Sequence, residues 1–158
     1  MSMIGYFKPA TIEEINDLND DKKAQEKFLV EAGATNIDKT FDIIHFTLTG
    51  KKYGSGSGAM SIEPFGVQHL EADMGYGPGS YLEPDELKIA AAHLENIGMK
   101  KFEIFIDAEQ LVRTGAYGIN EGDDDKAIIE YASPYYQKLR DLYLEAAKND
   151  QGMIFWVM

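Results

Sequence analysis

The stretch that decides the fold of this chain is Asp38-Lys39-Thr40-Phe41-Asp42-Ile43-Ile44-His45-Phe46-Thr47-Leu48-Thr49-Gly50. Apolar side chains recur along it at helical spacing: Ile37, Phe41, Ile44 and Leu48. Asp38 suits the N-cap of a helix, and Gly50 suits its C-terminal stop. The β-branched content also permits a strand, but the caps and the spacing together favour a helix. His45 lies beside the apolar stripe and, with Asp42 one turn before it, is the part of this helix that could take part in a reaction.

The residues before this stretch predict one strand and two helices. Residues 3–7 form an opening strand that ends at Lys8-Pro9, because proline cannot donate to a sheet ladder. Thr11 followed by Glu14 is a capping box, in which each side chain accepts from the other residue's backbone N–H. A helix is therefore expected from Thr11, and a second one over residues 20–32.

The second half of the chain predicts further helices and a closing strand. Residues 50–80 hold eight of the 15 glycines, so loops with one short strand at 67–70 are expected there. The remaining elements are a helix from Pro84 to Gly98, a short helix capped by Asp107, a helix over 128–147 broken or restarted at Ser133-Pro134, and a strand over 153–157. A strand near each terminus with helices between them predicts an α+β fold. It is one compact domain over residues 1–158, with a small sheet that includes both terminal strands.

The charge of the chain limits its partners. Among 158 residues, 27 are acidic and 15 are basic, which gives a net charge of −12. Phosphate backbones and anionic membrane surfaces would be repelled, so neither nucleic acid nor a membrane is expected as a partner. The charge would attract a basic protein, and it would also keep any soluble protein dispersed.

Composition excludes several classes of site. The chain has no cysteine, so disulfides, thiolate metal sites and a cysteine nucleophile are excluded. No apolar run is long enough for a membrane span, and the first residues lack the features of a signal peptide. We expect a cytoplasmic protein, and no sequence motif predicts a cofactor.

Four segments, in order along nearly the whole chain, resemble one family. They are Met1-Ser2-Met3-Ile4-Gly5-Tyr6-Phe7, Asp38-Lys39-x-Phe41-x-x-x-His45-x-x-Leu48-Thr49-Gly50, Gly75-Tyr76-Gly77-Pro78, and Tyr136-x-x-Leu139-Arg140-x-x-Tyr143-x-x-Ala146-Ala147. They are similar to segments of the YfbM-like bacterial proteins. This resemblance implies a small α+β domain of unknown function, and it brings no catalytic residue or cofactor with it. The chain departs from the family pattern at residues 116–119, which lead into an acidic loop.

His45 and Asp42 are the candidate catalytic residues. At a spacing of three on a helix, the carboxylate of Asp42 could orient the imidazole as a general base or a metal ligand. The simpler interpretation is a half-buried histidine that hydrogen-bonds to the backbone or to Asp42.

A second group of candidates is His69, Glu71 and Asp73, which alternate along the chain. On a strand they would share one face and could offer nitrogen and oxygen ligands to a divalent ion. A solvated strand face has the same pattern, so no metal site is assigned.

Binding candidates lie in the glycine-rich region and at one arginine. Residues 75–79 could present backbone N–H groups to an anion, although the glycine spacing does not match a dinucleotide loop. Residues 54–58 lack the lysine of a phosphate loop. The binding candidates are Tyr76, Gly77, Tyr81 and Arg113, the last as a clamp for a carboxylate or as the partner of a nearby acid.

Two functions of different classes follow. The first is a non-catalytic binding or interaction domain with an acidic surface, for example an immunity- or inhibitor-like protein that takes a basic protein partner. The alternative is a small hydrolase or transferase that uses His45 and Asp42 at a cleft bordered by residues 75–81. A third possibility is a structural subunit that dimerises, so the chain is expected as a monomer or a weak homodimer.

Overall fold

The computed structural model describes residues 2–30, 33–52, 65–66, 68–73 and 75–158. In order, its elements are β1 (Gly5–Ala10), α1 (Ile12–Asp20), α2 (Lys22–Val30), β2 (Thr35–Asn36), the 3-10 turn η1 (Asp38–Thr40), α3 (Phe41–Thr49), β3 (Gln68–Asp73), β4 (Pro78–Leu82), α4 (Pro84–Asn96), α5 (Met99–Phe105), α6 (Ala108–Thr114), α7 (Asp125–Lys148) and β5 (Gly152–Val157). Within these ranges, no helix has the length and apolar character needed to cross a membrane.

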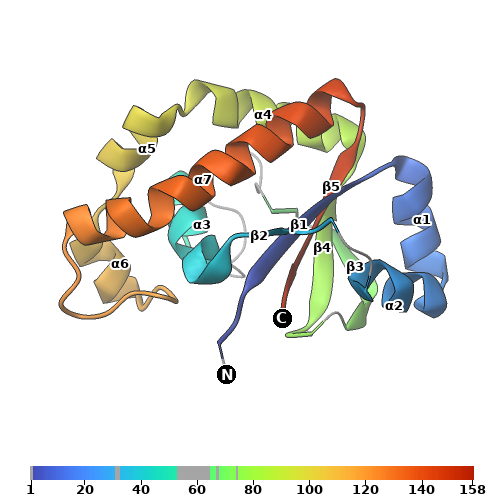
Figure 1. Cartoon of the computed structure of the whole chain (residues 1–158), viewed down its shortest axis with the longest axis horizontal. Helices are drawn as coiled ribbons and strands as arrows, with labels where there is room; N and C mark the ends of the chain where they lie inside the picture. The colour runs from blue at the N-terminus through green and yellow to red at the C-terminus, as the bar shows by residue number, and fades with distance from the viewer. Residues whose placement is uncertain (1, 31–32, 53–64, 67, 74) are drawn as a thin grey trace.

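The sheet is antiparallel and has the strand order β2-β1-β5-β4-β3. The last strand, β5, lies at its centre, with Phe155 opposite Phe7 of β1 and opposite Ser80 of β4. Ile4 and Met158 exchange backbone hydrogen bonds of 2.9 and 3.0 Å, so the two ends of the chain lie side by side (Figure 1). The predicted α+β domain with both terminal strands in its sheet is confirmed.

Helices cover both faces of the sheet, and β5 is buried between them. Side chains of β5 alternate: Phe155 packs with the core of α3–α7, whereas Ile154 and Trp156 pack with α1 and α2. Figure 1 shows the same division, with α1 and α2 on one side of the strands and the longer helices on the other. A strand buried on both faces reads as the continuous apolar run that the sequence shows.

The predicted helix caps are largely confirmed. The Thr11 hydroxyl accepts from the N–H of Glu14 at 3.2 Å, and the Glu14 carboxylate accepts from the N–H of Thr11 at 3.0 Å. Asp107 accepts from Gln110 at the start of α6. Gly50 ends α3 in the left-handed conformation (φ 77°).

The predicted cap at Asp38 is wrong. This residue belongs to η1, with φ 51°, and α3 begins three residues later at Phe41. Its carboxylate accepts from the hydroxyl of Tyr131 in α7 at 2.8 Å. The carboxylate that the local sequence predicts as the N-cap of the helix therefore makes a tertiary hydrogen bond instead.

Two predicted boundaries at prolines are also wrong. β1 continues through Pro9, which pairs with Met153. Because ladder bonds alternate from the Ile4–Met158 pair, the nitrogen of Pro9 points away from β5, toward a side where β2 pairs only with Tyr6 and Phe7. Pro134 lies inside the continuous helix α7, which tertiary contacts hold on both sides of it. The sequence also failed to predict β2, β4 and α5.

Candidate functional site

His45 lies in the middle of α3 with 0% of its surface exposed. Its Nδ1 is 2.7 Å from the carbonyl oxygen of Lys51, and because a carbonyl only accepts, Nδ1 donates in this contact. The Thr49 hydroxyl is 3.3 Å from the same nitrogen and 2.7 Å from the carbonyl of His45. These contacts tie the imidazole to the chain that leaves α3, next to the ring of Phe65.

Asp42 is also buried, at 3% exposure. Its Oδ2 accepts from the backbone N–H of Tyr117 at 2.8 Å. The ring of Tyr117 stacks on Phe41, and its hydroxyl accepts from the N–H of Met3 at 2.8 Å. Asp42 therefore fixes the segment after α6 against the start of α3, and its pairing with His45 stays a prediction.

The beginning of the segment 38–50 forms a hollow with the N-terminal turns of α7. The hollow measures about 320 Å³ and is lined by Lys39, Gly118, Ile119, Asn120, Asp123, Ala127, Ile128 and Tyr131. Gly118 has φ 86°, and a Cβ there would lie 2.9 Å from the carbonyl oxygen of Lys39, so only glycine fits. Burial and the hydrogen bond to Asp38 raise the pKa of Tyr131, which keeps its hydroxyl protonated.

Tyr76 and Tyr81, two of the binding candidates, differ in exposure. Tyr76 lies in the turn between β3 and β4, is 49% exposed, and donates its N–H to the carbonyl of Val157 at 2.9 Å. Tyr81 is buried in β4, where it pairs with Ile154. Its hydroxyl donates to Gln68 at 3.1 Å, so Tyr81 links neighbouring parts of the fold.

Gly77 and Arg113 have local structural contexts. Gly77 has φ 97° in the β3–β4 turn, a conformation that favours glycine. Arg113 lies near the end of α6 and contacts the carboxylate of Glu109, one turn earlier, at 2.6 Å. Both groups of that pair are largely exposed. The arginine thus has the neighbouring acid that was one of its two predicted partners.

The proposed metal ligands lie on β3, at the edge of the sheet. His69 pairs with Ser80, and Glu71 is exposed, but the pairing register shifts between His69 and Asp73. The side chain of Asp73, like the glycine-rich residues 54–58, lies outside the described part of the structure. Among the described residues, no three His, Asp or Glu side chains gather in a way that could hold a metal ion.

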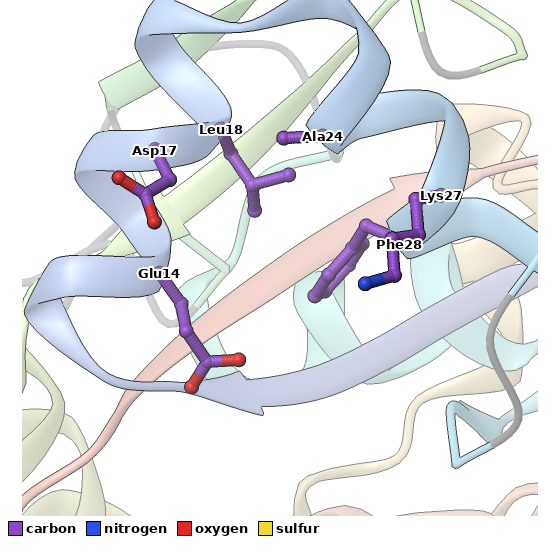
Figure 2. Close-up of a pocket in the computed structure, with 6 residues that line it drawn as sticks. All are labelled: Glu14, Asp17, Leu18, Ala24, Lys27 and Phe28. Carbon is purple, nitrogen blue, oxygen red and sulfur yellow. The ribbon is translucent and has the colours of Figure 1, made fainter.

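A separate hollow of about 180 Å³ lies between α1 and α2 (Figure 2). It is lined by Glu14, Asp17, Leu18, Ala24, Lys27 and Phe28. Beneath it, Phe28 contacts Trp156 edge-on at 5.6 Å, and the ammonium of Lys8 lies 4.4 Å from the Phe28 ring. The hollow is therefore shallow, with an apolar floor and charged side chains of both signs at its rim.

A comparison with protein families decides the family. The model of the "Domain of unknown function (DUF1877)" matches residues 1–156. The chain belongs to this family. A search of curated proteins found no match for the DUF1877 chain.

A solved structure shares the fold of this DUF1877 domain. It is the crystal structure of YfbM from Escherichia coli, described as a protein of unknown function. The two chains align with a TM-score of 0.73 and 21% identity, over 98% of this chain and 99% of that one. At this identity the match establishes the common fold, and the resemblance seen in the sequence is confirmed.

One surface of the DUF1877 domain was missed by reasoning from sequence. Ile104 and Phe105, at the end of α5, are 78% and 50% exposed. Gly98 was interpreted as the end of a helix, and no helix was expected between it and Asp107. The signal that could have found α5 is the helical spacing of Met99, Phe102 and Ile106, of which Phe102 and Ile106 are buried and Met99 packs against the core.

Proposed function

We propose that this DUF1877 domain is a non-catalytic binding domain of the cytoplasm that takes a basic protein partner, as an immunity- or inhibitor-like protein would. The observation that carries the proposal is the distribution of its charge. Residues 102–125 hold seven acidic side chains and one basic one, a net charge of −6 out of −12 for the whole chain. Half of the excess charge thus belongs to the segment that runs from the end of α5 through α6 and the loop after it to the first residue of α7.

These carboxylates belong to one end of the molecule. The backbone N–H of Ala108, at the start of α6, donates to the carboxylate of Asp125 at 2.8 Å, which joins the N-terminal ends of α6 and α7. Asp107, Glu109, Asp124 and Asp125 are all exposed. Figure 1 shows α5, α6 and the first turns of α7 together at one end of the fold. Exposed carboxylates of one sign steer a basic partner and lose this attraction as salt rises.

The environments of the candidate catalytic residues support a non-catalytic role. Substrate would have to reach an imidazole with 0% exposure, whose Nδ1 already binds the Lys51 carbonyl. Asp42 binds the N–H of Tyr117. A general base must come within hydrogen-bond reach of the proton that it removes, and these two side chains instead hold segments of the fold together.

The test is affinity capture with the purified domain at about 50 mM and about 300 mM salt, because screening weakens an electrostatic complex. The bait is the wild type, and bound proteins are identified by mass spectrometry. We expect a protein of basic isoelectric point that is retained at low salt and released at high salt.

A matched pair of variants assigns the effect. The triple variant Asp107→Asn, Asp124→Asn and Asp125→Asn removes three charges and keeps an oxygen at each cap. The control is Asp17→Asn, Asp20→Asn and Asp21→Asn, which removes three exposed charges at α1 and its end. The first variant is expected to lose the partner and the second to retain it. Recovery of no basic protein by the wild type at low salt would refute the proposed function.

A further inference from the structure

We infer that α5 and the acidic residues that follow it form a docking surface for a basic protein segment that carries large apolar side chains. This inference rests on the proposed function and specifies the surface and the chemistry of its partner. The occupant is a segment with lysines or arginines placed next to one or two apolar anchors.

The apolar part of the surface is the pair Ile104 and Phe105. Large hydrophobic side chains of the described part of the chain are mostly buried in the core. Ile104 and Phe105 instead have 78% and 50% of their surface exposed. Single exposed apolar residues are common on proteins, but two large ones in succession at the end of the same short helix give a partner two neighbouring apolar anchors.

The pair stands on a rigid support. On the inner side of α5, Phe102 is fully buried and stacks on Tyr136 of α7, with ring centroids 3.9 Å apart and planes at 12°. The hydroxyl of Tyr136 donates to the carbonyl of Ile97 at 2.6 Å, just before α5 begins. A helix fixed on one side presents its other side in a constant position, which lowers the entropy lost on binding.

The residues that precede Ile104 and Phe105 in the chain and those that follow them carry opposite charges. Lys100 and Lys101 are exposed one turn before this pair on α5, whereas Asp107 and Glu109 are exposed immediately after it. Glu109 is already paired with Arg113, so the acidic side consists of Asp107 with Asp124 and Asp125, and these three carboxylates outnumber the lysine pair. A bound segment should therefore place its basic residues over the start of α6 and direct any acidic residue or terminal carboxylate toward the lysines.

The same charges decide between a basic partner and a second copy of the chain. A two-fold arrangement could set the lysines of one copy against the carboxylates of the other. Each copy carries a net charge of −12, however, so two copies repel one another at long range. The net charge favours a basic heterologous segment.

The experiment selects binders from a phage-displayed library of random linear peptides, with the purified full chain as target. Enriched peptides are synthesised, and their affinity is measured by fluorescence anisotropy. We expect enriched sequences to combine lysine or arginine with large apolar residues. The double variant Ile104→Ser with Phe105→Ser should bind them at least about tenfold more weakly, as loss of a central apolar anchor does.

A matched control is Ile89→Ser, because Ile89 is another exposed apolar residue, 49% exposed, on α4. It should bind within about twofold of the wild type, since contacts outside an interface contribute little. Thermal unfolding of each variant verifies the fold, and exposed substitutions of this kind should leave it nearly unchanged.

Each other outcome overturns the inference in a distinguishable way. Basic peptides that bind the double variant as tightly as the wild type would leave the proposed function standing and refute this surface. A library that yields no basic peptide would also refute this surface, whereas the proposed function is decided separately by capture of a basic protein at low salt. Sedimentation that shows self-association of the wild type and none of the double variant would assign the surface to a second copy.

Discussion

The two faces of the sheet differ in whether their buried polar atoms have hydrogen-bond partners. On the face covered by α3–α7, Asp42, His45 and Ser80 each have a hydrogen-bond partner, namely the N–H of Tyr117 and the carbonyls of Lys51 and Phe65. On the face covered by α1 and α2, the Tyr81 hydroxyl is bonded to Gln68, but Gln25 Oε1 and Trp156 Nε1 are buried without a hydrogen-bond partner in the described structure.

The difference indicates how each face is held. Buried polar contacts on the larger face fix particular chain segments, and removal of one partner leaves the other unsatisfied. The smaller face relies on the packing of Trp156 with Phe28 and Tyr6. Polar substitutions should therefore cost more on the larger face, and the following predictions test that difference.

The largest effect is expected from Phe155→Ala in β5. Phe155 is 1% exposed and contacts Phe7 and Phe65 with ring centroids 4.6 and 4.9 Å apart. Its truncation opens a cavity at the centre of the larger core and should cost about 4 kcal/mol of unfolding free energy. Urea unfolding measures the loss. A cost below about 1 kcal/mol would mean that this core repacks freely, against the behaviour of close-packed interiors.

Asp42→Ala should cost about 3 kcal/mol, because it removes the charged acceptor of the buried Tyr117 N–H. The control Asp42→Asn keeps an acceptor and should cost about 1 kcal/mol. Urea unfolding of both variants gives the comparison. Equal stability of the two variants would show that the acceptor does not hold this segment.

His45→Gln should cost about 1–2 kcal/mol, since glutamine keeps a donor for the Lys51 carbonyl but loses the imidazole packing on Phe65. The thermal unfolding midpoint and capture of a basic partner are the two measurements. Lower stability with normal capture agrees with a structural role. Unchanged stability would contradict the assignment of this ring to the fold.

Ionisation of Tyr136, on the larger face, should make the free energy of unfolding depend on pH. Burial raises the pKa of Tyr136 from the ordinary value near 10 to about 12. The unfolded chain therefore releases this proton at lower pH than the folded chain does. Its contribution to stability is fully present below about pH 10 and is lost as pH rises to about 12, with a slope of about 1.4 kcal/mol per pH unit.

Unfolding in urea between these pH values measures that slope. Tyr136→Phe removes the titrating group, so its stability should fall less steeply with pH than that of the wild type. The variant should also lose about 1 kcal/mol at neutral pH, because the hydrogen bond to Ile97 is gone. Identical slopes in both proteins would refute the role of Tyr136.

The smallest effect is expected on the other face, from Trp156→Phe. The substitution removes an indole N–H that has no partner among the described residues, which offsets part of the lost packing. The net change should be within about 1 kcal/mol, whereas Trp156→Ala should cost about 4 kcal/mol. A cost near 3 kcal/mol for the phenylalanine variant would show that the N–H has a partner in solution and would remove the contrast between the faces.

Much of the fold could be predicted from sequence where the signal is local. The capping box of Thr11 and Glu14 begins α1, Gly50 ends α3, and the apolar run before the C-terminus forms β5. In each case the residue type satisfies a backbone requirement, or a burial requirement, within a few positions. The same local reasoning failed at Asp38 and Pro134, where contacts from distant segments outweigh local preference.

The candidate site was less predictable because its residues depend on partners far along the chain. The sequence places Asp42 and His45 one turn apart. It does not reveal that Asp42 binds Tyr117, 75 residues away, or that His45 binds Lys51 behind the end of α3. The α5 surface was missed because exposure depends on which helix face the rest of the fold covers.

The sequence by itself determined the family resemblance, the α+β class, most of the helix caps and the excess of acidic charge. These follow from residue type and short-range spacing, which need no knowledge of the fold. Only the tertiary structure decided that β5 lies at the centre of the sheet, that His45 is buried, and that Ile104 and Phe105 are exposed beside the carboxylates. The physical reason is that burial and electrostatic neighbours are properties of the packed chain, since they depend on which distant segments come together.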